Sequence, residues 1–178
     1  NYSTELSKKQ NYGRPDMMTA DEYRNRTDVN ITDYGQNADW WDALLQKDNF
    51  SQKHHLSLEL GTENAQVYTS FFYETNEGIT IKDNRKDYGG RLNANFKLFD
   101  GWLEIRPIVD YRQTARTSDG SDEDKKANFK QALYNNPTRS PFDPESPTGY
   151  NVWTGETLDY NIVADRMLTD YEGLDKWF

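Results

Sequence analysis

The residues with the most chemical potential in this sequence are two adjacent histidines and a short acidic run. His54 and His55 are metal-ligating types, but neighbours on a strand point to opposite faces and no third ligand follows at a suitable spacing. The acidic run at 119–124 has the side chains of a calcium loop without the spacing and glycine of an EF-hand. A solvated acidic turn is the simpler interpretation, and we expect no metal and no cofactor.

Aromatic side chains in polar segments are the remaining candidates for ligand binding. The sequence offers no Ser/His/Asp set, no phosphate-binding glycine loop and no isolated carboxylate pair, so we expect no enzyme. Aromatic rings can stack on sugars or on apolar peptide side chains. Tyr150 and Trp153 lie in a proline-rich stretch where core packing is hard to argue, whereas Trp40 and Trp41 also fit as anchors of a short helix. These four are the predicted ligand-binding residues.

The composition excludes several classes of protein. The chain has 178 residues and a net charge of −9, and an acidic surface of this kind repels nucleic-acid phosphates. It has no cysteine, which excludes disulfides. Aromatic residues make up 14% of the chain, which argues against disorder. No apolar run reaches the roughly 20 residues of a membrane-spanning helix, whereas a strand of a membrane barrel needs only about 9–11.

A two-residue repeat of apolar side chains indicates β-strands after residue 50. Leucine occupies every second position of 56–60, and residues 67–73 alternate in the same way after a turn at 61–64. This pattern predicts a β-hairpin. The polar segment at 75–87 then predicts a long loop.

A second hairpin is predicted between residues 91–98 and 103–112. Asp100 and Gly101 separate the two strands, and Asp-Gly between alternating strands is among the strongest short hairpin signals. Pro107 is the one discordant residue, because proline cannot donate to a ladder and usually marks an edge or a bulge.

One row of this second hairpin is apolar and the opposite row is charged. On a soluble sandwich the apolar row would pack on a core, and the charged row would meet water. In an outer-membrane barrel the apolar row faces lipid and the charged row faces a hydrated lumen. Short connections that alternate with long ones, and aromatics near strand ends, favour the barrel. The predicted lumen-facing residues are Arg91, Asn93, Asn95, Lys97, Glu104, Arg106, Asp110 and Arg112.

Short helices are predicted in the polar segments. Thr19 and Glu22 fit a capping box, and Asn37 or Asp39 can cap a helix that contains the two adjacent tryptophans. Residues 126–136 have the composition for two or three further helical turns.

Five short segments follow one another in a characteristic order. They are DYGQNADWWD (33–42), FSQKHHLSL (50–58), GTEN (61–64), FYETNEGI (72–79) and YGGRLNANF (88–96). Their order and spacing resemble the SusC/RagA branch of TonB-dependent outer-membrane transporters. The later stretch NIVAD (161–165) is similar to that branch's Asn-Pro-Val-Ala stretch, with Ile162 in place of proline. The likeness runs through most of residues 1–115 and thins over the proline-rich loop.

The resemblance implies an all-β fold of antiparallel up-and-down strands, part of an outer-membrane barrel of about 22 strands around a plug domain. It implies TonB-dependent import of oligosaccharides or peptides across the outer membrane of a Gram-negative, Bacteroidetes-type bacterium. The implied partners are a SusD-like surface lipoprotein, outer-membrane lipid, the substrate, and the TonB complex, which would engage a plug and TonB box that this chain does not contain.

Within that frame the chain is one segment of a single barrel domain. The expected parts are a strand at 1–7, an extracellular loop with short helices at 8–50, two hairpins at 51–115, a long extracellular loop at 116–160, and the start of the next strand at 161–178. The alternative is a soluble antiparallel β module that binds carbohydrate through loop aromatics. The two interpretations differ in whether the apolar rows face lipid or a closed core.

Overall fold

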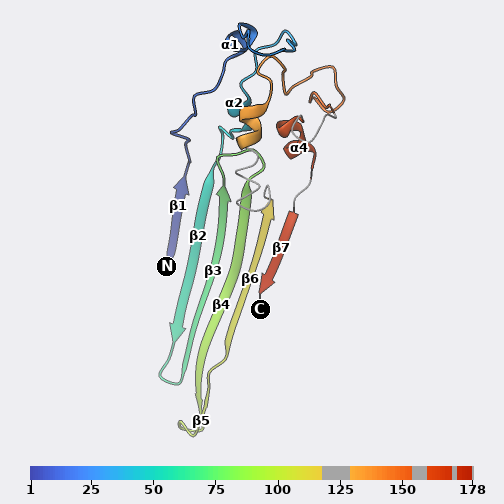
Figure 1. Ribbon diagram of the computed structural model, residues 1–178. Coiled ribbons are helices and arrows are strands. Elements are labelled where there is room, and N and C mark those ends of the chain that lie inside the picture. Colours follow the sequence, from blue (N-terminus) through green and yellow to red (C-terminus); the bar gives the residue numbers. More distant parts are fainter. Residues whose placement is uncertain (118–128, 154–159, 170–171, 178) are drawn as a thin grey trace.

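Seven strands of the described chain form one antiparallel sheet (Figure 1). The computed structural model describes residues 1–117, 129–153, 160–169 and 172–177. The strands are β1 (Tyr2–Ser7), β2 (Ser51–Gly61), β3 (Ala65–Glu77), β4 (Asn84–Leu98), β5 (Leu103–Ile105), β6 (Ile108–Thr117) and β7 (Glu172–Trp177). Their order across the sheet is β1-β2-β3-β4-β6-β7, with β5 beside β4. The antiparallel, mostly β character predicted from the sequence is confirmed, and the sheet is open.

Both predicted hairpins are present. Leu60 pairs with Val67 across the first turn, and Leu98 pairs with Leu103 across the second. The second turn holds three successive residues at positive φ, with Phe99 and Asp100 both at 55° and Gly101 at 89°. Glycine adopts this region without strain, which explains why the turn needs it. β4 ends at Leu98 and β5 begins at Leu103, so the connection is longer than the two-residue Asp-Gly turn predicted from the sequence.

The predicted long loop at 75–87 is wrong. β3 continues to Glu77 and β4 begins at Asn84, so only residues 78–83 leave the ladder. A hydrogen bond of 2.6 Å from the Gly78 N–H to the Asp83 carbonyl closes this short connection. The segment is polar because the two strands extend beyond the apolar part of the sheet, and polar strands lack the two-residue hydrophobic signal.

Pro107 interrupts a strand without changing its register. Phe96 pairs with Ile105 before the interruption and Asn93 pairs with Ile108 after it, so no bulge is inserted. The proline carbonyl still accepts a hydrogen bond of 3.0 Å from the Ala94 N–H. In such an antiparallel pair the reciprocal bond would run from residue 107 to the Ala94 carbonyl, and proline cannot donate it, so the ladder is interrupted here between β5 and β6.

Short helices gather at one end of the sheet, opposite the two tight hairpin turns (Figure 1). They are α1 (Ala20–Arg24), α2 (Trp40–Leu44), α4 (Ile162–Leu168) and a helical segment at 129–134. The predicted capping box of α1 is confirmed, because Thr19 and Glu22 bond reciprocally, and Asp39 caps α2. In the described parts of the chain, no helix has both the length and the apolar character needed to cross a lipid bilayer.

The return to a strand predicted from residue 161 onward is corrected by α4. The Asn161 side chain accepts hydrogen bonds from the Val163 and Ala164 N–H groups, at 3.0 and 3.1 Å, and so begins a helix. Ile162 and Val163 are fully buried. The strand begins later, at Glu172. An apolar run this short does not distinguish a strand from a buried helix.

The buried core lies among the helices and away from most of the sheet. It is formed by Trp40, Leu44, Ala132, Ile162 and Val163. We call the described residues 8–50, 78–83, 129–153 and 160–169 the loop cap. Its parts are joined by backbone hydrogen bonds, because the Gln36 and Ala38 N–H groups donate to the Thr138 and Pro137 carbonyls at 2.9 and 2.8 Å.

Gly89 is a position in β4 where no side chain fits. A Cβ there would collide with the Tyr111 carbonyl oxygen and would lie 2.7 Å from the Phe72 ring. At Gly90 the nearest atom is 3.0 Å away and belongs to the movable ring of Phe71. We expect Gly89→Ala to lower the free energy of unfolding by about 1–3 kcal/mol and Gly90→Ala by much less. Denaturant unfolding of the two variants measures the difference, and equal losses would contradict it.

Candidate functional site

One face of the sheet is apolar and exposed. The register places Leu58, Thr69, Leu92 and Val109 in one row across β2, β3, β4 and β6. Leu58 is 50% exposed and Val109 is 58% exposed. Other exposed apolar side chains of this face are Leu6, Leu56, Leu60, Phe71, Leu98, Leu103 and Ile105. The face therefore contributes its side chains to the surface, while the buried core lies in the loop cap.

Aromatic side chains mark both ends of this apolar face. Near the loop cap, the Tyr2 and Tyr73 rings stack on either side of His54, with ring centroids 6.2 and 6.4 Å apart, and Tyr73 pairs with Tyr88. At the hairpin turn, Phe99 and Trp102 are 73% and 83% exposed, and the Phe99 ring meets the Trp102 ring edge-on.

The two aromatic bands lie near opposite ends of the long strands of the sheet. Residues 88–99 span about 37 Å at ~3.4 Å per residue of extended strand. At a strand tilt of ~45° this gives a height of about 26 Å, close to the apolar band of roughly 25 Å on outer-membrane barrels. Beyond the band nearer the loop cap, the same face carries the polar residues Gln52, Thr75 and Lys86.

The eight predicted lumen-facing residues lie on the opposite face. Arg91 pairs with Asp110 and Lys97 with Glu104 in the register, and the other four alternate in step with them. Several are joined by ion pairs: the Arg91 and Asp110 charged groups are 3.8 Å apart, and those of Arg106 and Glu104 are 2.7 Å apart. The two rows thus differ in chemistry, with charged and amide groups on one side and aliphatic groups on the other, except that Ile108 lies on the polar side, opposite Asn93, and is 65% exposed.

A buried carboxylate on the polar face was missed by the sequence reasoning. Asp87 is 2% exposed. It pairs with Arg85 and Arg112 at 2.6 and 2.9 Å and accepts a hydrogen bond of 2.6 Å from the Thr114 hydroxyl. The Arg112 guanidinium also lies 5.7 Å from the centre of the Phe72 ring. Asp87 was assigned to the loop at 75–87, so no strand alternation drew attention to it.

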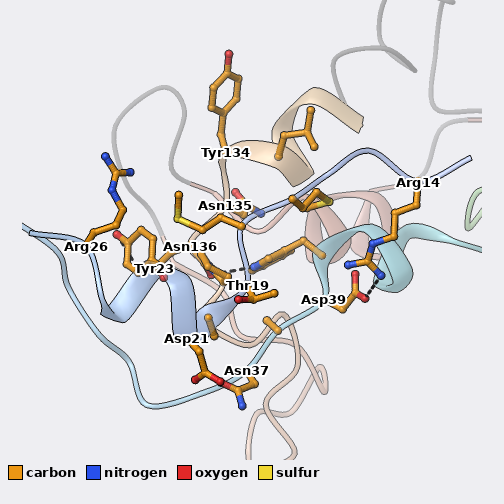
Figure 2. Close-up of a pocket in the computed structure, with 17 residues that line it drawn as sticks. Arg14, Thr19, Asp21, Tyr23, Arg26, Asn37, Asp39, Tyr134, Asn135 and Asn136 are labelled. Atoms are coloured by element: carbon orange, nitrogen blue, oxygen red, sulfur yellow. Dashed lines mark hydrogen bonds and ion pairs between the residues drawn. The ribbon is translucent and has the colours of Figure 1, made fainter. Parts of the chain in front are cut away.

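The loop cap contains a pocket of about 530 Å³ (Figure 2). Its walls come from three stretches of chain: the entry to α1 with Met17 and Met18, the entry to α2 from Asn37 to Trp40, and residues 133–137 at the end of the helical segment 129–134. Trp40 lines this pocket, and its indole N–H donates to the Asn136 carbonyl at 3.0 Å. The pocket depends on contacts between segments about 100 residues apart in the sequence.

Each charged group in the pocket wall is paired, two of them with residues outside the lining: Arg26 with Asp28, and Asp21 with Arg24 at 3.1 Å. The Arg14 guanidinium lies 2.6 Å from the Asp39 carboxylate, and Arg26 binds Asp28 through two hydrogen bonds of 2.9 and 2.5 Å. The Arg26 guanidinium lowers the pKa of Asp28 to about 2. Each of these ion pairs joins one cation and one anion, so the pocket wall presents little net charge to a ligand.

The four predicted ligand-binding aromatics are engaged in packing. Trp40 is 1% exposed, and the Trp41 ring centroid lies 4.6 Å from that of Phe129. Trp153 meets the edge of Trp40 at 6.0 Å and carries the Arg139 guanidinium 3.6 Å above its ring. Tyr150 packs beside Phe142. Of the four, Trp40 alone lines the pocket within the described chain.

Two pocket tyrosines were not predicted. Tyr23 belongs to α1 and Tyr134 to the helical segment at 129–134. Figure 2 shows Tyr134 at the rim, directed outward, with Tyr23 lower in the wall. Both lie in segments that the sequence marked as helical, but helix periodicity alone does not reveal which distant element faces a given side chain.

The histidine pair has neighbours other than a metal. His54 Nδ1 lies 2.7 Å from the Tyr2 hydroxyl and 3.2 Å from the Thr4 hydroxyl. Among the described residues, no group of three or more His, Asp or Glu side chains is arranged to hold a metal ion. The acidic run at 119–124 falls outside the described residues.

The ion pair between Arg14 and Asp39 makes the pocket wall sensitive to acid. Partial burial alone would raise the pKa of Asp39, but the Asp42 N–H and the Arg14 guanidinium outweigh it and lower the pKa. Because the pKa of Asp39 is lowered in the folded protein, its ionised carboxylate stabilises the fold at pH values above about 3.9, the ordinary pKa of an aspartate. This stabilisation is lost as the pH falls through the pKa that Asp39 has in the folded protein. We expect tryptophan fluorescence of the loop cap to stay constant from neutral pH to about pH 4 and to change below it.

The variant Asp39→Asn separates this ion pair from helix capping, because asparagine still caps a helix. In this variant we expect the loop cap to be less stable at neutral pH, and its tryptophan fluorescence to change less on acidification. An acid transition identical to that of the unaltered protein would show that the pair with Arg14 has no part in it.

The function of the chain is inferred from these two faces and this pocket. No protein-family model matches the chain, and no curated protein matches it either.

Proposed function

We propose that this chain forms part of the barrel wall of a TonB-dependent outer-membrane transporter of the SusC/RagA type. The transporter would import oligosaccharides, or peptides, into a Gram-negative cell. In this proposal the chain is the N-terminal segment of a barrel of about 22 strands. The apolar face contacts lipid, and the charged face lines a hydrated lumen.

The observation that carries the proposal is the exposed apolar face bounded by two aromatic bands. Leu6, Leu60 and Val109 are 60%, 60% and 58% exposed. A soluble module would lose about 25 cal/mol for each Å² of apolar surface left in water, and large exposed apolar patches mark interaction sites. A bilayer removes this cost, and tyrosine and tryptophan are favoured at both of its interfaces.

The polar face and the loop cap support the same assignment. Paired charges such as Arg91 with Asp110 are stable beside water and costly beside lipid. Tight turns at one end of the sheet and a folded cap at the other match the short periplasmic turns and long outer loops of such barrels. The cap then faces the cell exterior, where a SusD-like lipoprotein and the substrate would meet it. A plug with its TonB box would supply the coupling to TonB.

The soluble carbohydrate-binding alternative receives less support. It requires the aliphatic rows to be covered and the loop aromatics to be free. The leucines of β2 are half exposed or more, and Trp153 is stacked beneath the Arg139 guanidinium.

Single cysteine labels on neighbouring residues test the proposal. This segment has no cysteine, so Val109→Cys and Asp110→Cys each introduce one label site into it, on opposite faces. The full gene product, with any cysteines elsewhere replaced by serine, is spin-labelled and placed in lipid vesicles. The label at 109 should collide mainly with oxygen, which concentrates in lipid, and the label at 110 with a water-soluble nickel chelate. Equal nickel accessibility at both sites would refute a lipid-facing row.

A further inference from the structure

We propose that the loop-cap pocket of Figure 2 binds a short uncharged oligosaccharide. The inference rests on the proposed function, because it names one of the two substrate classes and gives it a place on the outer side of the barrel. Three observations support it: the size of the pocket, the pairing of its charges, and a buried side-chain amide nitrogen that has no partner among the described residues.

The pocket is large enough for a ligand of several rings. Its volume of about 530 Å³ falls within the range of roughly 300–1,000 Å³ that is typical of small-molecule sites. It is also built from fixed elements, because Asn136 joins parts of its wall: the Asn136 side-chain amide donates to the Thr32 carbonyl at 2.8 Å, and the Asn136 backbone carbonyl accepts from the Trp40 indole N–H. A site preformed in this way loses little free energy on ordering.

The charges of the wall favour a neutral ligand. Arg14 is paired with Asp39, and Arg26 with Asp28. An anionic ligand would have to displace a carboxylate from its guanidinium, and a cationic ligand would have to displace a guanidinium from its carboxylate. Either exchange gives up a charge-assisted hydrogen bond for a similar one. A neutral ligand leaves both pairs intact.

Hydrogen-bonding capacity in the wall favours a ligand rich in hydroxyl groups. Asn135 lines the pocket and is 8% exposed. Its side-chain oxygen accepts from Gln131 at 2.8 Å, but its side-chain amide nitrogen has no hydrogen-bond partner in the part of the chain that the structure describes. A buried donor without an acceptor destabilises the fold, and a ligand that accepts from it removes this penalty. A hydroxyl group can accept from this nitrogen and at the same time donate elsewhere.

Apolar groups alternate with the polar ones around the wall. Met17, Met18 and Leu133 line the same pocket as Asn135, with the Tyr134 ring at its rim. A sugar ring presents C–H faces and hydroxyl edges together, and aromatic rings supply a flat apolar surface with a polar tip. The methionine side chains are unbranched and flexible, so Met17 and Met18 can adapt to the shape of a ligand.

Binding to the full-length protein in detergent tests the proposal by calorimetry. The probes are short uncharged oligosaccharides with different backbones, a uronic-acid oligosaccharide as the anionic control, and a neutral glycine-alanine peptide. We expect an uncharged oligosaccharide to bind. Met18→Arg fills the pocket with a long charged side chain and should abolish binding, and Tyr134→Ala should weaken it about tenfold, as expected for the loss of ~1.4 kcal/mol.

The matched control is Tyr12→Ala, because Tyr12 is 93% exposed and does not line this pocket. It should leave the affinity unchanged. Met18 and Tyr134 are themselves 46% and 61% exposed, and an unchanged tryptophan spectrum confirms that the cap of each variant is folded. Binding that persists in folded Met18→Arg, or no binding by any uncharged oligosaccharide, would overturn the assignment. Peptide binding that Met18→Arg abolishes would overturn the sugar class.

The failure of this inference is distinguishable from failure of the proposed function. The labels at 109 and 110 report only which face meets lipid, and they do not depend on the pocket. If the labels behave as expected and no oligosaccharide binds, the pocket assignment alone is wrong.

Discussion

Leu58→Arg is expected to prevent most of the protein from assembling in the outer membrane. Leu58 lies in the row with Leu92 and Val109, between the two aromatic bands of the apolar face. An arginine at the middle of a bilayer costs about 2–4 kcal/mol on a barrel surface. The folded fraction, measured by resistance to protease and by heat-dependent migration on a gel, should fall accordingly.

The control for this variant is the neighbouring substitution Ser57→Arg. It adds the same side chain to the same strand on the opposite face, where Lys53 and Glu74 already form an ion pair of 3.6 Å. We expect it to change the folded fraction little, because a charge that meets water is not desolvated. Equal loss in both variants would mean that position 58 does not face lipid.

Trp40→Ala is expected to open the loop cap while leaving the sheet paired. Trp40 is the largest fully buried side chain of the cap core. It contacts the edge of Trp153 and donates its indole N–H to Asn136. Removal of a buried tryptophan typically costs about 3–5 kcal/mol. Hydrogen exchange of the Gln36 and Ala38 amides, which donate to residues 137–138, should accelerate by about a thousandfold for a loss of ~4 kcal/mol.

The same substitution at Trp102 provides the control, since that tryptophan is 83% exposed at the hairpin turn. Trp102→Ala should leave the exchange of the cap amides unchanged. If Trp40→Ala also leaves them unchanged, the cap is held by its backbone hydrogen bonds and not by its core. Loss of oligosaccharide binding in Trp40→Ala would not distinguish a role in the core from a role in the pocket, because Trp40 belongs to both.

The hairpins could be predicted because their determinants are local. The leucines at 56, 58 and 60 and the Asp100-Gly101 turn act through neighbours in the sequence, and a period of two leaves few alternatives to a strand. The capping box at Thr19 is equally local. The sequence does not show that residues 75–77 and 84–87 are strands, because they are polar; only the pairing of β3 with β4, and of β4 with β6, shows that they belong to the sheet.

The pocket and the buried Asp87 could not be predicted, because each depends on segments far apart in the sequence. Tyr34 meets Thr138 through a hydrogen bond of 3.1 Å across about 100 residues. Arg139 lies between the Tyr34 and Trp153 rings, at 4.7 and 3.6 Å from their centres. The residue types mark Trp153 as a candidate ligand-binding residue, and only the structure shows that its ring contacts Arg139 and Trp40.

By itself, the sequence determined that an antiparallel sheet forms and that its two faces differ, because the alternation of side chains along an extended strand is a property of each strand alone. Tertiary structure decided that the apolar face stays exposed while a separate core forms among the loops. It also decided which aromatic rings are buried and where a pocket opens. The reason is that the burial of a side chain depends on which distant segments pack against it, and a local sequence pattern does not specify those segments.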